Sequence, residues 1–235
     1  MDDKEKLEQH LETLLKENKI TSRELVEMSE KLKKRYPGLP HVCDYYGYAV
    51  DIGWYAFEGH RFSPDPNAYP NLQGVVAWLS RNLHAEPGEQ GLIITPDKIT
   101  KPWGDYCPPY NSLDDGKQNT LSMLKDVRKR AESMSYFGKD LPIALWCAKY
   151  CKNGVKPGEG FMPAIHQLEA IVDNSYRVND ALKRINGALI GGTIWSSSET
   201  GQRAYCIKTE WLRTGPTIES ESKWIDYHVR CVIAF

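Results

Sequence analysis

No stretch of this sequence has a bias in charge or hydropathy that assigns a function directly. The net charge over 235 residues is −1, so there is no global excess of positive charge for nucleic acid or an anionic membrane. No apolar run approaches the roughly 20 residues that span a bilayer as a helix. We therefore expect no nucleic-acid partner and no membrane insertion. The N-terminus lacks the basic-then-apolar order of a secretory signal, which predicts that a complete natural chain is made in the cytoplasm.

The six cysteines do not form a recognisable disulfide framework or metal site. They are sparse and irregularly spaced, at positions 43, 107, 147, 151, 206 and 231, whereas zinc sites need closely spaced ligand pairs. Cys147 and Cys151 lie four residues apart on an expected helix, where parallel Cβ directions make a bridge between them geometrically poor. We expect free structural thiols, no metal and no cofactor.

Sequence signatures of catalysis are absent as well. The chain has no G-x-S-x-G, no phosphate-binding loop, no G-x-G-x-x-G and no H-E-x-x-H. Ser196–Ser198 have no apparent basic partner, and a serine alone is not activated. Asp114 and Asp115 are adjacent, so their side chains point apart, and an N-cap role for the next helix is the better interpretation. Residues 65–67 supply too few oxygen ligands for calcium. We predict that the chain is not an enzyme.

The chain divides into a helical N-terminal segment, residues 1–37, and one folded body, residues 38–235. Leucines at helical spacing and a capping box at 21–24 predict two amphipathic helices in the first segment. Their apolar stripe either packs on the folded body or joins copies of the chain as an oligomerisation or attachment segment. Both interpretations stay open, because two short heptads are too few for a convincing coiled coil.

In the folded body, short β-prone runs come first, helices follow, and strands return after Gly191. The predicted early strands lie at 45–52, 75–79 and 91–95, and the predicted helices at 119–132, 141–150, 165–172 and 178–185, the last closed by Asn186-Gly187. This order predicts an α+β fold. The apolar, β-prone run 227–235 predicts a final strand in the core, to which Trp195, Val229, Val232 and Phe235 contribute.

Several motifs of the folded body resemble segments of the C-type-lectin-like domains found in Bacteroides-type surface and phage proteins. The clearest are the Trp-Ser-Ser-Ser-Glu run at 195–199 and the closing Val-Arg-x-Val pattern within 229–235. The others lie at 91–93 ahead of 103–104, and at 115–120, 161–169, 179–182 and 187–189. The resemblance covers about residues 43–235. It implies a C-type-lectin-like fold with an N-terminal helical extension, related to formylglycine-generating enzymes and to the variable proteins of diversity-generating retroelements.

In that superfamily, ligands meet an exposed face formed by the last strands and loops. The segment 200–227 has matching chemistry, since polar residues mixed with Trp, Tyr and Arg on a rigid frame are typical of binding surfaces. We expect the ligand to contact Thr200, Gln202, Arg203, Trp211, Arg213, Thr214, Thr217, Ser220, Ser222, Trp224, Asp226 and Tyr227. Burial of Trp211 and Trp224 is the alternative, and Arg230 is better explained as a structural ion pair or backbone clamp.

The sequence therefore predicts a non-enzymatic recognition module for a macromolecular or glycan ligand on a cell surface. The expected context is a phage or prophage receptor-binding protein, hence virion-associated, or a retroelement-diversified variable protein. Two alternatives remain. A structural subunit of a fibre or pilus would place a neighbouring subunit against 200–227. An enzyme related to formylglycine-generating enzymes would need a close cysteine pair, but Cys206 and Cys231 are 25 positions apart.

Overall fold

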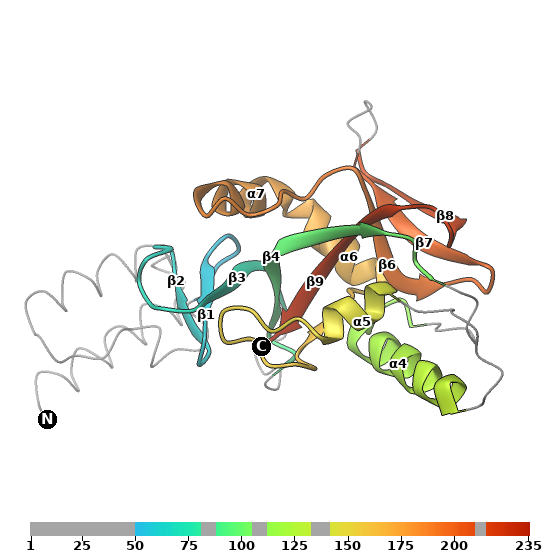
Figure 1. The fold of residues 1–235 in the computed structure, drawn as a ribbon. Coiled ribbons are helices and arrows are strands. Elements are labelled where there is room, and N and C mark those ends of the chain that lie inside the picture. Colours follow the sequence, from blue (N-terminus) through green and yellow to red (C-terminus); the bar gives the residue numbers. More distant parts are fainter. Residues whose placement is uncertain (1–49, 81–87, 105–111, 133–141, 210–214) are drawn as a thin grey trace, which may run out of the picture.

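The computed structural model describes residues 50–80, 88–104, 112–132, 142–209 and 215–235. In these ranges the chain forms one large mixed sheet with helices on both of its faces (Figure 1). The strands are β1 (Tyr55–Phe57), β2 (Arg61–Ser63), β3 (Leu72–Leu79), β4 (Gly91–Lys101), β5 (Gly160–Phe161), β6 (Thr193–Glu199), β7 (Arg203–Lys208), β8 (Thr217–Ser222) and β9 (Tyr227–Ala234). The helices are α4 (Gly116–Glu132), α5 (Pro142–Ala148), α6 (Ile165–Asp173) and α7 (Ser175–Arg184).

The sheet contains both early and late strands of the chain, which meet where β4 pairs with β9 at its centre. Its nine strands follow the order β2-β1-β3-β4-β9-β6-β7-β8, with β5 paired to β9 beside this path. Neighbouring strands are antiparallel except β6 and β9, which run parallel. The central pairing extends from Leu92 opposite Ala234 to Lys101 opposite Tyr227, with an irregularity between Ile94 and Lys98. Strand β9 therefore has neighbours on both of its edges.

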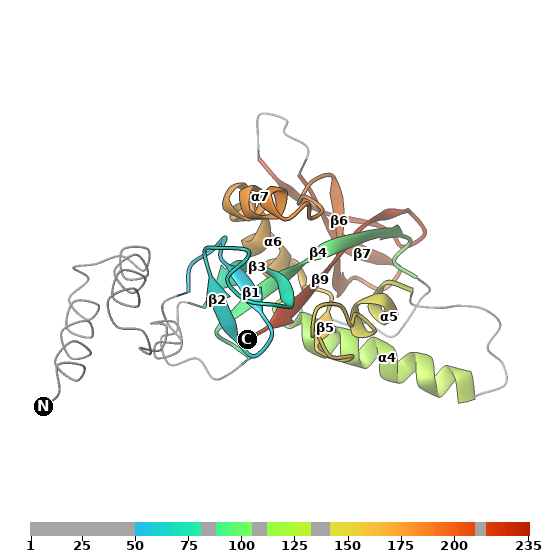
Figure 2. The same cartoon turned by 60° about the vertical axis from the view of Figure 1, so that its left-hand side comes forward.

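Helices cover both faces of this sheet, so its central strands are buried on both sides. Figure 2 shows α6 and α7 on one side of the sheet and α4 and α5 on the other. In β9, Val229, Cys231 and Ile233 belong to the hydrophobic cluster that includes α4 and α5, whereas Val232 belongs to the cluster formed with α6 and α7. Successive strand residues point to opposite faces, which explains the nearly continuous apolar sequence of β9. The prediction of a final core strand is confirmed.

The one charged residue in the buried part of β9 binds backbone carbonyls instead of an acid. Arg230 is 1% exposed, and its guanidinium donates to the carbonyl oxygens of Ala188 at 2.6 Å and Thr95 at 2.7 Å. Thr95 lies in the irregular part of β4, where the ladder to β9 is interrupted. Burial lowers the pKa of Arg230 to about 10, which still leaves it charged at neutral pH. The interpretation of Arg230 as a backbone clamp is confirmed.

The three serines of the 195–199 run are structural. All three are fully buried. The hydroxyl of Ser198 accepts from the amide of Ile165 at 3.0 Å and donates to the carbonyl of Ser112 at 2.8 Å. The backbone carbonyl of Ser196 accepts from the indole N–H of Trp103 at 2.8 Å. The hydroxyl of Ser197 accepts from the side-chain amide of Asn119 at 3.2 Å. This row of small polar residues therefore holds loops around β6 together.

The four helices expected in the folded body are confirmed, with boundaries shifted by a few residues. Asp115 caps α4, because its carboxylate accepts from the amide of Gln118 at 2.8 Å. At the end of α7, Asn186 adopts a positive φ of 54° and the amide of Gly187 donates to the carbonyl of Leu182 at 2.8 Å. Local signals of periodicity and capping therefore located these elements correctly.

The predicted fold class is wrong. We expected an α+β body with a C-type-lectin-like fold and an N-terminal helical extension, but the described chain is dominated by one nine-stranded mixed sheet with few helices. The physical reason is the long-range pairing of β4 with β9, which merges the early and late strands into a single sheet. The predicted helices of residues 1–37 and most of the predicted strand 45–52 lie outside the described residues.

Replacing Ser198 by alanine should lower the free energy of unfolding by about 1–3 kcal/mol, because it leaves the buried amide of Ile165 without its hydrogen-bond acceptor. Urea denaturation followed by fluorescence measures this change. Ser220→Ala is the matched control: its hydroxyl has no hydrogen bond to any described residue, so the change should stay within about 0.5 kcal/mol. Equal losses in the two variants would contradict a structural role for the buried row.

Candidate functional site

A buried ion pair anchors the turn between β8 and β9. The ammonium of Lys223 bonds to the carboxylate of Glu199, and both side chains are almost inaccessible, at 3% and 0% exposure. The same ammonium lies 4.4 Å from the ring centroid of Trp103, a cation–π contact. The amide of Gly104 also donates to the carbonyl of Lys223 at 3.4 Å. Four interacting groups from three segments thus fix the start of this turn.

The next two residues of the turn point to solvent. Trp224 is 67% exposed and Ile225 is 37% exposed, although both are large hydrophobic residues. The amide of Ile225 donates to the carbonyl of Ser222 at 3.2 Å, which closes the turn. Exposed aromatic residues on a rigid frame contribute much contact area at low entropic cost. We call Trp224, Ile225 and the adjacent exposed Asp226 the turn surface.

Charged side chains pair with one another along strands β7 and β8, which lead to the turn surface. Lys208 lies 2.6 Å from a carboxylate oxygen of Glu219 and 3.1 Å from one of Glu221. Arg203 donates to the carbonyl of Ser220 at 2.5 Å and 3.0 Å and reaches Glu221 at 3.4 Å. Of these charged residues only Arg203 was predicted to contact a ligand, and its guanidinium already binds Ser220 and Glu221 within the chain.

The predicted site residues fall into two groups in space. The turn after β6 lies next to the turn after β8, because Glu199 pairs with Lys223 and Arg203 lies opposite Ser222 in the ladder. Thr217 lies at the other end of β8, about 17 Å along the strand. The predicted residues near the turn surface, at the end of β8, are Thr200, Gln202, Arg203, Ser222, Trp224 and Asp226. Trp211, Arg213 and Thr214 lie outside the described residues.

Two residues that were predicted to contact a ligand interact with other parts of the chain. Tyr227 packs its ring on Trp195, with centroids 4.8 Å apart, and belongs to the edge of the core. Ser220 is half-buried and offers its backbone carbonyl to Arg203. Trp224, in contrast, is exposed, so the alternative of its burial is excluded.

Sequence reasoning missed the residues that hold the turn surface in place. Lys223 was not singled out, and Glu199 was noted only as part of a motif. The available signal was Glu199 at the end of a strand that is otherwise apolar or small, where a buried carboxylate requires a partner. The identity of that partner depends on the tertiary structure. Ile225 was also missed, because single exposed apolar residues are common.

Two titratable groups of β7 have pKa values that are raised by their surroundings. Burial, followed by the nearby charge of Glu221, raises the pKa of Cys206 to about 12, so it stays a neutral thiol at neutral pH. The hydrogen bonds that Lys208 donates to Glu219 and Glu221 raise its pKa, which keeps it a cation at neutral pH. Within the described ranges, no group of three His, Cys, Asp or Glu is placed to hold a metal ion.

His228 lies near the start of β9 among cationic neighbours. Its ring nitrogens are 3.0 Å from the hydroxyl of Thr100 and 3.4 Å from the ammonium of Lys98. Burial, followed by the charges of Lys98 and Arg230, lowers the pKa of His228 below its ordinary value of 6.5. The folded chain therefore favours the neutral imidazole.

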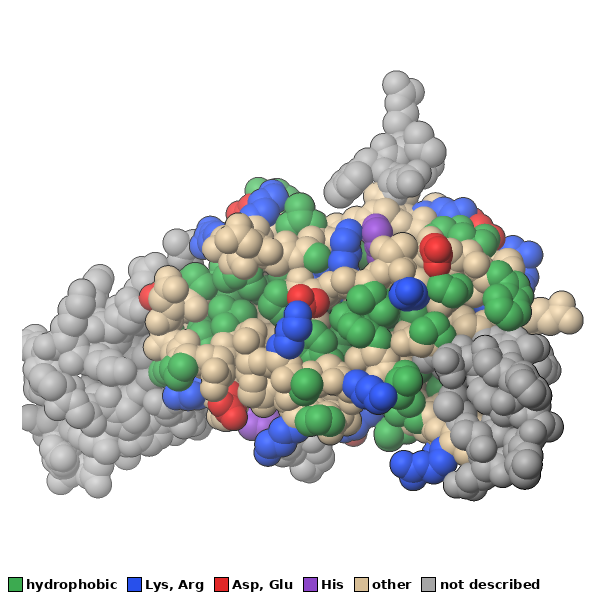
Figure 3. Space-filling model, viewed as in Figure 1, with side chains coloured by type: hydrophobic (Ala, Val, Ile, Leu, Met, Phe, Trp, Pro, Cys, Tyr) green, Lys and Arg blue, Asp and Glu red, His purple; other side chains and the backbone are tan. Residues whose placement is uncertain are grey.

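A separate cavity of about 500 Å³ lies away from the turn surface. Phe62, Ile93 and Phe235 line its apolar part, and Lys117 and Lys156 lie at its polar part. None of its lining residues belongs to the predicted site. In the space-filling view, charged side chains of both signs are scattered over the visible face, in keeping with the net charge of −1 (Figure 3). None of the described helices is long and apolar enough to cross a membrane.

Comparison with known proteins identifies a likeness of fold. No family model matches the chain, and no curated protein matches it. Among solved structures, a fimbrial protein from Bacteroides ovatus ATCC 8483 matches with a TM-score of 0.59 and 14% sequence identity. The match covers 79% of this chain and 49% of that protein, so the chain spans about half of its length. At this identity the comparison establishes the fold alone, and that fold replaces the one expected from the sequence.

Lys223→Met should lower the free energy of unfolding by about 3–5 kcal/mol, because Glu199 then stays buried without its cationic partner. Chemical denaturation measures the loss. Lys208→Met removes the more exposed cation of Glu219 and Glu221 and should cost much less stability than Lys223→Met, because solvent screens this pair. The double variant Glu199→Gln/Lys223→Met should recover part of the lost stability. No recovery would mean that the pair is not the main interaction at this turn.

Lowering the pH below about 6.5 should destabilise the wild type more steeply than His228→Gln. The folded pKa of His228 is lowered, so the unfolded chain binds the proton more readily between the folded pKa and 6.5. Stability is therefore complete above this window and falls as the pH drops through it. Melting temperatures measured at closely spaced pH values test this. The exposed His166→Gln serves as control and should keep the steep loss.

Proposed function

We propose that this chain is a non-enzymatic subunit of a fimbria or a related surface fibre, and that its turn surface contacts a partner in that assembly. The observation that carries the proposal is the fold shared with a fimbrial protein. The chain spans about half of that protein, so its place within a fibre is part of the proposal. This proposal adopts one of the alternatives drawn from the sequence, a structural subunit of a fibre or pilus.

The turn surface supports a role in association. Trp224 is exposed, while the residue before it is fixed by a buried ion pair and a cation–π contact. A large aromatic side chain that is already ordered loses little conformational freedom on binding, and Trp is enriched among residues that dominate interface energies. Asp226 and Gln202 are exposed nearby and supply polar groups for the rim of such a contact.

The buried serine row and the paired charges support the non-enzymatic part of the proposal. Ser196–Ser198 are inaccessible and their hydroxyls bind structural partners. Lys208 and Arg203 are paired within the chain. No finding favours the phage receptor-binding or retroelement-diversified interpretation over the fimbrial one, so that interpretation stays a prediction from the sequence.

On cells that express this chain, an antibody against it should label surface fibres in immunogold electron microscopy, and the chain should be recovered in the sheared fibre fraction. A variant carrying Trp224→Ala and Ile225→Ser should be incorporated at least about tenfold less, since loss of one hot-spot aromatic typically costs 1.4 kcal/mol or more. Quantitative immunoblotting of the sheared fraction measures this ratio.

Tyr176→Ala is the matched control, because Tyr176 is 83% exposed on α7 and outside the turn surface. Its incorporation should equal that of the wild type. Tyr176→Ala should keep the wild-type melting temperature, and the double variant should stay folded with a slightly lower one, because Ile225 is partly buried. Recovery of the wild-type chain only from the cytoplasm would overturn the fimbrial proposal. Normal incorporation of the double variant would overturn only the role of the turn surface.

A further inference from the structure

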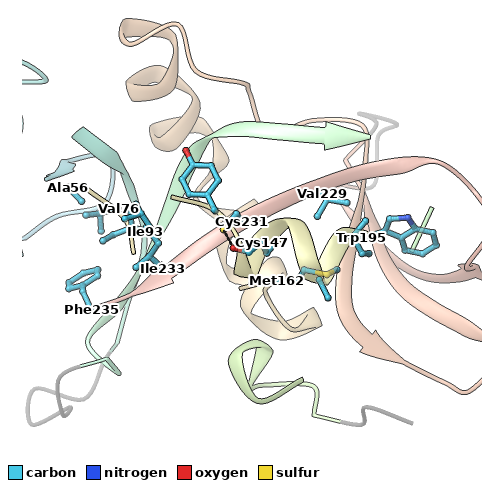
Figure 4. Packing of buried hydrophobic residues seen from close by; sticks show 14 of the residues in the cluster. Ala56, Val76, Ile93, Cys147, Met162, Trp195, Val229, Cys231, Ile233 and Phe235 are labelled. Carbon is cyan, nitrogen blue, oxygen red and sulfur yellow. Dashed lines mark hydrogen bonds between the residues drawn. The ribbon is translucent and has the colours of Figure 1, made fainter. Parts of the chain in front are cut away.

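Two cysteines from distant parts of the sequence meet in the core. Cys147 lies on α5 and Cys231 on β9, and the two are 84 positions apart. The sulfur of Cys231 lies 3.7 Å from the carbonyl oxygen of Cys147. The sulfur of Cys147 lies 3.9 Å from the carbonyl oxygen of Arg230, the residue directly before Cys231. Each thiol therefore lies against the backbone of the other cysteine, and Figure 4 shows the two side by side in the hydrophobic cluster.

The surroundings of the pair are tight. Both cysteines are fully buried. A Cβ atom at Gly160 would lie 2.6 Å from the sulfur of Cys231 and 2.5 Å from the carbonyl oxygen of Cys147, so only glycine fits there. Burial, followed by the neighbouring thiol of Cys231, raises the pKa of Cys147 well above its ordinary value. In the folded chain both sulfurs are thus shielded from solvent, and Cys147 stays a neutral thiol.

We propose that Cys147 and Cys231 form an intramolecular disulfide when the chain folds in the presence of a disulfide donor. One cysteine thiolate attacks a sulfur of the donor and releases one donor thiolate. The second cysteine sulfur attacks the resulting mixed disulfide, releases the second donor thiol and closes the Cys147–Cys231 bond. The two cysteines lose two protons and two electrons, and the donor disulfide is reduced to two thiols. Exchange precedes the packing of α5 on β9, which covers both sulfurs.

The other described cysteines are less suited to this reaction. Cys206 is buried on β7, in the ladder position opposite Trp195, and Cys151 is exposed beyond the end of α5. A bond between Cys147 and Cys231 would close a long loop, which restricts the unfolded chain most effectively. It would attach α5 to the central strand of the sheet. This inference revises the expectation of free thiols only, and it does not depend on the proposed function.

The test refolds the full wild-type chain in parallel with reduced glutathione alone and with a mixture of reduced and oxidised glutathione. After alkylation of free thiols and digestion with trypsin, mass spectrometry under non-reducing conditions should detect a peptide containing Cys147 linked to one containing Cys231. Lys149 separates Cys147 from Cys151, and Arg230 precedes Cys231, so the assignment is unambiguous. The oxidised form should melt about 10 °C above the reduced form.

Cys147→Ala should abolish both the linked peptide and the difference in melting temperature, whereas Cys151→Ala should preserve both. Since the decisive measurement uses the wild type, a variant that fails to fold leaves the test intact. The proposal is overturned if the folded wild-type chain from the oxidising buffer carries both Cys147 and Cys231 fully alkylated. It is equally overturned if the main linkage joins either residue to a different cysteine.

Discussion

The antiparallel pairing of β4 with β9 is the constraint on which the described structure depends. It joins a strand from the first half of the chain to the last strand, over a register that runs from Leu92 opposite Ala234 to Lys101 opposite Tyr227. The ladder is interrupted near Thr95, and the guanidinium of Arg230 satisfies a carbonyl exposed by that interruption. Because buried backbone groups must be paired, this clamp lets an irregular strand lie in the centre of the sheet.

The position of the turn surface follows from that central pairing. Strand β9 begins at Tyr227, immediately after the turn, so its register sets where the turn lies. At the start of the turn, the cost of burying the charges of Glu199 and Lys223 is offset by their mutual attraction and by the contact of Lys223 with the Trp103 ring. The result is an ordered support under the exposed Trp224. This exposed side chain on a fixed backbone is the feature on which the proposed association rests.

Part of the candidate site was predictable from the sequence, because aromatic and polar residues alternate in the last third of the chain. That pattern included Trp224, which is exposed, yet it could not show that Arg203 already binds the backbone of β8. It also grouped Thr217 with the turn, although the length of β8 lies between them. Linear proximity does not determine which end of a hairpin a residue occupies; strand direction and register do.

The sequence by itself determined the helices, their caps and the buried character of the final strand, since helical periodicity, capping and apolar runs act between residues only a few positions apart. Only the tertiary structure decided that early and late strands share one sheet, that Glu199 meets Lys223, and that Cys147 meets Cys231. These contacts join segments tens of residues apart. Many pairings are compatible with the same local pattern, and close packing of both sheet faces selects among them.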